Sequence, residues 1–150
     1  MITCTFAGHR EVFGSCKQQI ETALERLMEN EDSLHCYVGG MGEFEAFSAA
    51  AVRNLNRKYP HKEIRLTLVL PYMQQKLNEH REYYETSFDD ILIPSELAGI
   101  HYKRAILARN RWLVDHSDYL IAMVWRNFGG AYATLQYAQK RGKKIILLKR

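Results

Sequence analysis

The sequence has few cysteines, and none of them is spaced for a metal site or a redox pair. Its 150 residues include three, Cys4, Cys16 and Cys36, and no C-x-x-C motif. Disulfide frameworks belong to oxidising compartments and use even numbers of cysteines, so three isolated ones indicate free thiols. We therefore expect a cytoplasmic protein whose cysteines lie in or near the core.

Long apolar runs are also missing. No stretch approaches the roughly 18 apolar residues that a membrane-spanning helix requires. The first residues lead directly into ITCTFA, without the basic region and long apolar region that a secretory signal would show. Secretion, membrane insertion and a membrane partner are therefore not expected.

Several familiar nucleotide and metal motifs are absent too. There is no G-x-x-x-x-G-K-[ST], which excludes a P-loop ATPase. The nearest approach to a dinucleotide motif is GMGEFE, where Glu45 replaces the third glycine, so an NAD or FAD site is disfavoured. There is no H-E-x-x-H, and the six histidines are scattered. We expect neither a metal site nor a bound cofactor.

The composition that remains is that of an ordinary globular domain. Hydrophobic residues make up 47% of the chain and charged residues 25%, with a net charge of +4. A chain of this length fits one domain with a sizeable core. The modest basic surplus favours anionic partners, and a nucleotide satisfies it as well as DNA does.

Apolar and amphipathic stretches alternate along the chain. Strands are expected at 2–7, 34–38, 63–70, 91–93, 119–125 and 144–148. Helices are expected at 15–30, where Ser15 and Gln18 form a capping box, and at 43–58, 101–116 and 130–141. The region from 72 to 90 gives a weaker signal for a short helix and a turn. Alternating strands and helices, with several wholly apolar strands, predict a Rossmann-like three-layer α/β domain over residues 1–150, with a mostly parallel sheet.

Three glycine-bearing loops follow expected strands. They are Gly8-His9-Arg10, Gly39-Gly40-Met41-Gly42 and Phe128-Gly129-Gly130-Ala131. Ligands of such sheets bind at the carboxyl ends of the strands, where glycine allows a close backbone approach and a following helix offers free amides. Glycines also serve simply to make tight turns, but three such loops at one edge favour a ligand site.

One residue of the 101–116 helix breaks its pattern. Tyr102, Ala105, Ile106, Trp112 and Leu113 define an apolar face, and Arg109 falls on it. A buried guanidinium needs a partner. That partner is either an acid such as Glu43 or Glu45, or the phosphate or carboxylate of a ligand.

These segments together resemble a known superfamily. FAGHR, YVGGMGEFEAFSAAAVRNL, LVLPY, HYKRAILARNRWLVDHSDYLIA and FGGAYATLQYAQKRGKKIILL are similar to the SLOG superfamily, named for DprA/Smf and the Lonely Guy proteins, and within it to the bacterial YpsA-like branch. The resemblance covers nearly the whole chain except about 73 to 95. It implies a Rossmann-like fold that binds a nucleotide or a nucleotide-derived ligand at the glycine loops.

The Lonely Guy members add an enzymatic implication. They cleave the N-glycosidic bond of nucleoside monophosphates with an Arg, an Asp nine residues later, and P-G-G-x-G-T-x-x-E. Arg109, Asp118 and Gly129-Gly130 match, whereas Gln136 stands where the essential Glu belongs. An amide cannot act as a general base, so Glu45 or Glu43 would have to supply the catalytic carboxylate.

The leading prediction is a nucleotide-binding sensor or binding protein. We expect the phosphate over Gly129-Gly130, with Thr134 and Arg109 in support, and the ribose or base facing the other two loops. The remaining ligand-binding residues are then Gly8, His9, Arg10, Gly39, Gly40 and Gly42. Two alternatives stay open: nucleotide N-glycosidic bond cleavage, and binding of single-stranded DNA with Tyr72, Tyr83, Tyr84 and Trp125 as stacking surfaces. A homodimer is a further possibility.

Overall fold

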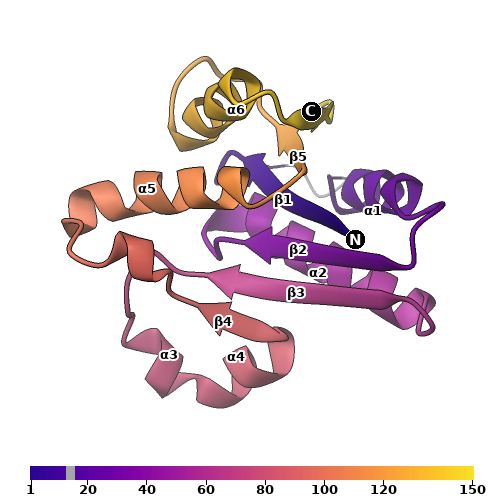
Figure 1. Ribbon diagram of the computed structural model, residues 1–150, viewed down its shortest axis with the longest axis horizontal. Helices are drawn as coiled ribbons and strands as arrows, with labels where there is room; N and C mark the ends of the chain where they lie inside the picture. Colours follow the sequence, from indigo (N-terminus) through magenta and orange to yellow (C-terminus); the bar gives the residue numbers. More distant parts are fainter. Residues whose placement is uncertain (13–15) are drawn as a thin grey trace.

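The computed structural model describes residues 1–12 and 16–150, and they form a six-stranded sheet between layers of helices (Figure 1). The strands are β1 (Ile2–Gly8), β2 (Ser33–Val38), β3 (Glu63–Val69), β4 (Asp90–Leu92), β5 (Tyr119–Met123) and β6 (Lys144–Leu147). The helices are α1 (Cys16–Leu27), α2 (Gly42–Lys58), α3 (Lys76–Glu79), α4 (Arg81–Ser87), α5 (Tyr102–Asp115) and α6 (Gly130–Lys140), with a short 3-10 turn at Ser95–Leu97.

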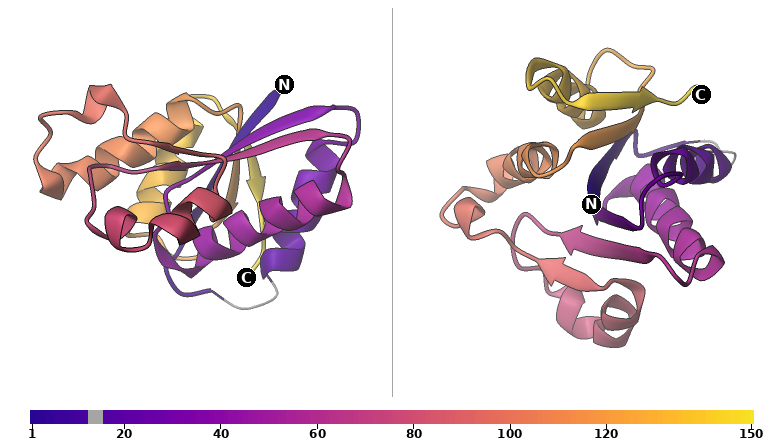
Figure 2. Two further views of the ribbon diagram at one scale, coloured as in Figure 1. Left: turned by 90° about the horizontal axis from the view of Figure 1, so that it is seen from below. Right: turned by 45° about the vertical axis from the view of Figure 1, so that its right-hand side comes forward.

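The sheet has the order β4-β3-β2-β1-β5-β6, and every neighbouring pair is parallel. Helices α1 and α2 cover one face and α5 lies on the other, as the right-hand view of Figure 2 shows. The chain moves outward from β1 to β4 and then returns to β5, so the strand order reverses between β1 and β5. The prediction of a Rossmann-like three-layer fold is confirmed, and the reversal point is where such sheets leave a crevice.

The core follows from the apolar side of each element. Helix α1 buries Ile20, Ala23 and Leu24 at helical spacing against the sheet. Cys4 of β1 lies beside Cys36 of β2 in register, and both are fully buried free thiols. Burial raises the pKa of the Cys4 thiol well above its ordinary value, so it packs as a small apolar group.

Two expected elements end two or more residues earlier than their sequence pattern, and the other ends agree to within one residue where a range was predicted. Helix α1 ends at Leu27, three residues before the expected end, and the predicted Ser15 cap lies outside the described residues. Strand β5 ends at Met123 rather than at Trp125, because the backbone amides of Trp125 and Arg126 turn toward the His9 ring instead of continuing the ladder. The β5 loop is thereby joined to the β1 loop.

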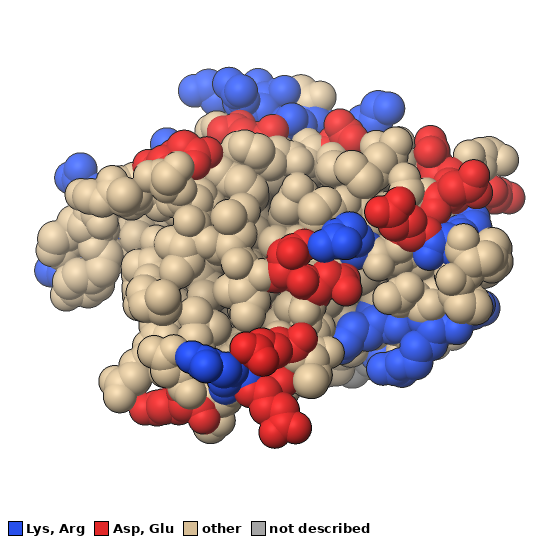
Figure 3. All heavy atoms as spheres, turned by 60° about the horizontal axis from the view of Figure 1, so that its bottom comes forward, with Lys and Arg blue, Asp and Glu red and all other residues tan. Residues whose placement is uncertain are grey.

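Surface charge is mixed on the face that comes forward in Figure 3. Lys and Arg side chains gather near its upper edge and lower right, acidic side chains lie among them and near the centre, and a broad area on the left carries few charges. No helix within the described ranges is long and apolar enough to cross a membrane.

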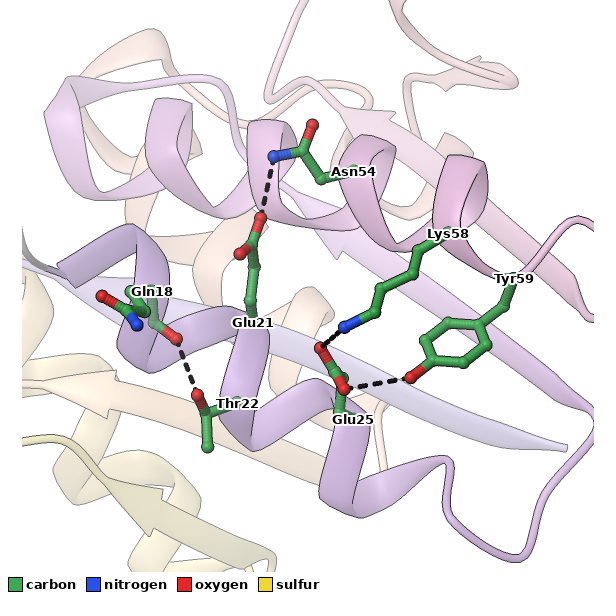
Figure 4. Close-up of polar contacts among 7 residues, drawn as sticks. All are labelled: Gln18, Glu21, Thr22, Glu25, Asn54, Lys58 and Tyr59. Atoms are coloured by element: carbon green, nitrogen blue, oxygen red, sulfur yellow. Dashed lines mark hydrogen bonds and ion pairs between the residues drawn. The ribbon is translucent and has the colours of Figure 1, made fainter.

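Polar contacts join α1 to α2 on the face away from α5 (Figure 4). Glu25 accepts hydrogen bonds from Lys58 Nζ and from the Tyr59 hydroxyl, each 3.0 Å long, and Asn54 donates to Glu21 over 2.8 Å. The hydrogen bonds from Lys58 and Tyr59 lower the pKa of Glu25. Such exposed pairs add little stability, although they join the two helices along their length.

Candidate functional site

A pocket of about 450 Å³ opens at the carboxyl ends of β1 and β5, where the strand order reverses. The end of β1 and the loop after it form one wall, α5 another, and the start of α6 the third. Its lining includes Gly8, His9, Arg10, Glu45, Ile106, Arg109, Asn110, Arg126, Phe128, Gly129, Gly130 and Thr134. Eight of the twelve predicted site residues are therefore brought together in one cavity.

The start of α6 presents open backbone to this pocket. Gly129 precedes the helix with a φ of 93°, and no first-turn residue is acidic. A Cβ atom added to Gly129 or Gly130 would meet nothing within 4 Å, so no neighbouring atom requires either residue to be small, although the positive φ of Gly129 itself favours glycine. The first amides of a helix have no intrahelical partner and carry a partial positive charge. This wall suits an anion that contacts the backbone directly.

Thr134 is buried, and its hydroxyl donates to the Gly130 carbonyl over 2.9 Å within the same helix. That bond holds the side chain against its own helix, where it lines the pocket. The single hydroxyl proton of Thr134 is used by this bond, so the side chain can accept a hydrogen bond from a ligand but has no proton left to donate.

The backbone fixes the tautomer of the neutral His9 ring. Its Nε2 accepts hydrogen bonds from the amides of Trp125 and Arg126, each 3.2 Å long, so the proton of the neutral ring is on Nδ1. The Trp125 ring packs edge-on at 4.4 Å between centroids. Burial, and then the positive charge of Arg126, lowers the pKa of His9 below its ordinary 6.5. His9 therefore offers the pocket a neutral N–H donor.

Gly8 is small because of the protein's own packing. A Cβ at this position would lie 2.2 Å from Cγ of Phe44, a fully buried ring on α2. The β1 loop can approach α2 only if residue 8 has no side chain. Gly8, which the sequence predicted as a ligand contact, is thus required by the packing of the core, although its backbone still lines the pocket.

Arg109 is only 1% exposed, and it links three elements from inside. Its Nη1 donates to the carbonyls of Gly39 and Val69, both over 2.9 Å, and its Nε donates to Asn110 Oδ1 over 3.0 Å. Its Nη2 contacts Met41 Sδ at 3.6 Å. Backbone carbonyls are thus its main partners, and Nη2 is the nitrogen that keeps donor capacity beside the pocket.

Glu45 fixes the same turn from the other side. Its two oxygens accept the amides of Gly39, over 2.8 Å, and Met41, over 2.7 Å. Within the described chain it forms no direct ion pair with Arg109. Gly39 lies between the two: its N–H donates to Glu45, and its carbonyl accepts from Arg109. Burial raises the pKa of Glu45, and the charge of Arg109 and the two amides offset part of that rise.

Met41 is the other residue of the 39–45 turn that lines this pocket, whereas the predicted site residues Gly39, Gly40, Gly42 and Glu43 do not. Glu43 points to the β1 loop, where its carboxylate accepts the amide of Val12 over 3.1 Å and its own amide donates to the Arg10 carbonyl over 2.9 Å. Gly39 lies against Arg109, since a Cβ there would be 2.7 Å from Cζ. Gly40 and Gly42 have positive φ and line a smaller cavity on the other side of the turn.

Several pocket residues were missed from the sequence, among them Asn110, Arg126 and Phe128. Arg126 lies exposed at the mouth, and Phe128 is 64% exposed beside Gly129. The signal for Arg126 was its place directly after an apolar strand and shortly before two glycines. Phe128 begins the third glycine loop, but no sequence pattern marked its side chain as a ligand contact. Together with Arg10 and Arg109, Arg126 gives the pocket lining three arginines against two acids, Glu11 and Glu45.

The other residues matched to the Lonely Guy motif lie elsewhere. Asp118 sits at the opposite, amino end of the strands, where it accepts hydrogen bonds from the amide and hydroxyl of Thr3. Gln136 is exposed and donates to the Tyr132 hydroxyl over 2.9 Å. Neither lines the pocket. Across residues 1–12 and 16–150, no group of three or more His, Cys, Asp or Glu is placed to hold a metal ion.

Comparison with known proteins gives matches of fold only. No family model and no curated protein matches the sequence. DNA processing protein A from Helicobacter pylori, described for its single-stranded DNA binding mode, aligns with a TM-score of 0.68 and 19% identity over 99% of this chain and 66% of its own. The chain thus spans just under two thirds of that protein.

Two further solved structures are similar. TM1055 aligns with a TM-score of 0.61 and 13% identity, covering 97% of this chain and 72% of its own. The molybdenum cofactor carrier protein of Chlamydomonas reinhardtii aligns with a TM-score of 0.54 and 13% identity, over 99% of this chain and 77% of its own. At these identities the likeness shows a shared α/β fold.

Proposed function

We propose that the 450 Å³ pocket binds a nucleotide or a nucleotide-derived ligand. The observation that carries the proposal is the open start of α6: two glycines whose missing side chains leave free space, no acid in the first turn, and arginines at the mouth. A helix N-terminus with a glycine-rich approach is a ready phosphate site. The resemblance to the SLOG superfamily, and to its YpsA-like branch, points the same way.

The rest of the pocket supplies what a nucleoside would need. His9 offers a neutral Nδ1–H, and Asn110 offers an amide, both suited to ribose hydroxyls. Phe128 presents an aromatic ring that no other described ring contacts, and Ile106 adds apolar surface from α5. An exposed ring beside a phosphate site suits stacking with a base.

The test is a titration of AMP, GMP and cyclic AMP, first by thermal shift and then by calorimetry for any that stabilise the protein. Gly130→Asp places an acid in the first turn of α6. It should lower nucleotide affinity at least about tenfold through charge repulsion, yet raise the stability of the ligand-free protein by about 0.3 to 1 kcal/mol because acids favour a helix N-terminus.

Gln136→Glu is the matched control. It makes the same change in charge on the same helix, at an exposed position outside the pocket. Screening by salt should keep its effect on affinity within about twofold. The proposal fails if no nucleotide stabilises the wild-type protein, or if Gly130→Asp binds as well as wild type does.

Glu45 favours one enzymatic alternative, cleavage of a nucleotide's N-glycosidic bond. It is a pocket carboxyl whose pKa is raised by burial, as a general base or acid often is. Its oxygens already accept two amides, which leaves part of their acceptor capacity for a substrate. Incubation with AMP and chromatography for free adenine tests this. Release that disappears in Glu45→Gln supports catalysis, and no release from the wild type leaves binding alone.

The likeness to DNA processing protein A favours a second alternative, binding of single-stranded DNA. A strand-binding groove would need a continuous basic track, and the one face that Figure 3 shows mixes acidic with basic side chains instead. A mobility shift with an oligothymidine at low salt, weakening steeply as salt is added, would support DNA. No shift at low salt would dismiss it.

A further inference from the structure

A second cavity of about 120 Å³ lies on the other side of the 39–42 turn, between the ends of β2 and β3 and the α3–α4 segment. Its walls are mainly apolar: Val38, Ala46, Ala49, Leu68, Leu70, Tyr84 and Phe88. Neither α3 nor α4 contributes a fully buried residue, so these short helices cover the strand ends without filling the space behind them. An apolar cavity of roughly 150 Å³ can hold a benzene-sized guest, and this one suits a body of about five carbons.

One charged residue in the lining has no protein partner. Lys76 is half-buried at the start of α3, and among the described residues its ammonium makes no hydrogen bond or ion pair. Lys76 is thus an unpaired positive charge in the lining of a mainly apolar cavity. Lys76 therefore marks the place where a negative group would be stabilised.

The other cationic side chain of the lining, Arg53, already has partners within the cavity wall. Arg53 of α2 donates to the Ser87 carbonyl over 3.2 Å, and its guanidinium lies 5.9 Å from the centre of the Phe88 ring. These contacts fasten the end of α4 to α2. The wall formed by Arg53 and Phe88 is thus held by contacts between α2 and α4.

We propose that this cavity binds a small amphipathic monocarboxylate, with its apolar body among Leu68, Leu70 and Phe88 and its carboxylate on Lys76. The site is separate from the nucleotide pocket and does not depend on the function proposed for it. The two share a wall, however, because Glu45 lines both cavities. An occupant of the small cavity would therefore contact the carboxyl that holds the amides of Gly39 and Met41.

Pentanoate is the probe, and pentanamide, of nearly the same shape but uncharged, is the matched control ligand. Titration followed by amide chemical shifts in ¹H–¹⁵N spectra should move the signals of Leu68, Leu70 and Lys76. The amides of Gly39 and Met41 should move with them, because their hydrogen-bond acceptor borders the cavity.

Lys76→Met should weaken pentanoate binding about tenfold, the loss that follows removal of a hydrogen bond to a charged group, and should leave pentanamide unchanged. Lys103→Met, at an exposed α5 position outside both cavities, should change neither. Ala46→Leu fills the cavity from an exposed helix position, so it should weaken both ligands without unfolding the protein.

Three results would overturn the proposal. The first is that pentanoate causes no saturable shifts at millimolar concentrations. The second is that the shifts map to the larger pocket instead of Leu68 and Leu70. The third is that Lys76→Met binds pentanoate as tightly as the wild type does.

Discussion

Replacing Arg109 by methionine should cost more stability than any other change to a charged residue of α5. The side chain is 1% exposed, and its Nη1 donates hydrogen bonds to the carbonyls of the buried residues Gly39 and Val69. Each buried acceptor left without a partner costs about 1 to 3 kcal/mol. Arg109 also offsets the charge of Glu45. We therefore expect Arg109→Met to lower the free energy of unfolding by about 2 to 6 kcal/mol, the cost of two carbonyls left without this partner.

The assay is urea-induced unfolding followed by circular dichroism at neutral pH. Arg104→Met is the matched control, since Arg104 is exposed on the same helix, and we expect it to change stability by less than about 0.5 kcal/mol. Arg109→Lys keeps the charge but loses the planar fork of donors, so its free energy of unfolding should fall between those of Arg109→Met and Arg104→Met. If Arg109→Met unfolds at the same urea concentration as Arg104→Met, the inference that Arg109 joins these elements is wrong.

Three further predictions concern the pocket walls. Gly8→Ala should lower the free energy of unfolding by about 2 kcal/mol or more, because its Cβ would lie 2.2 Å from the Phe44 ring; thermal unfolding checks this, and an unchanged midpoint would contradict it. Because burial lowers the pKa of His9, the neutral ring stabilises the fold fully above pH 6.5, and that contribution is lost as pH falls below it. His9→Gln should therefore flatten the stability profile below pH 6.5, and an unaltered profile would refute the role of the ring. Phe128→Ala should weaken AMP about fivefold and leave ribose 5-phosphate unchanged in calorimetry, since stacking requires a base; equal losses for both ligands would argue against stacking.

Much of the fold could be predicted because its signals are local. The apolar runs of the strands and the helical spacing of Ile20, Ala23 and Leu24 required no knowledge of distant contacts. The predicted ends of the helices and strands were less accurate than their positions along the chain. Strand β5 stops at Met123 because of His9, which is more than 100 residues away in the chain, and no local pattern contains that information.

The site was predicted in part for the same reason. Glycine after a strand indicates a turn at the ligand edge, but not whether the space left by the missing side chain belongs to a ligand or to the protein. Gly130 faces open space, whereas Gly8 and Gly39 are required by Phe44 and Arg109. That distinction depends on tertiary packing. The apolar face expected on α5 was likewise correct for buried Leu113 but not for Tyr102, which is 61% exposed at the first turn.

A crystal structure of the protein with AMP tests the central claim most directly. The account predicts the phosphate at the start of α6, with oxygens about 3 Å from the amide nitrogens of Gly130 and Ala131. The base should then lie against Phe128. A phosphate bound at the 39–42 turn or on surface lysines, with the start of α6 free of ligand, would contradict it.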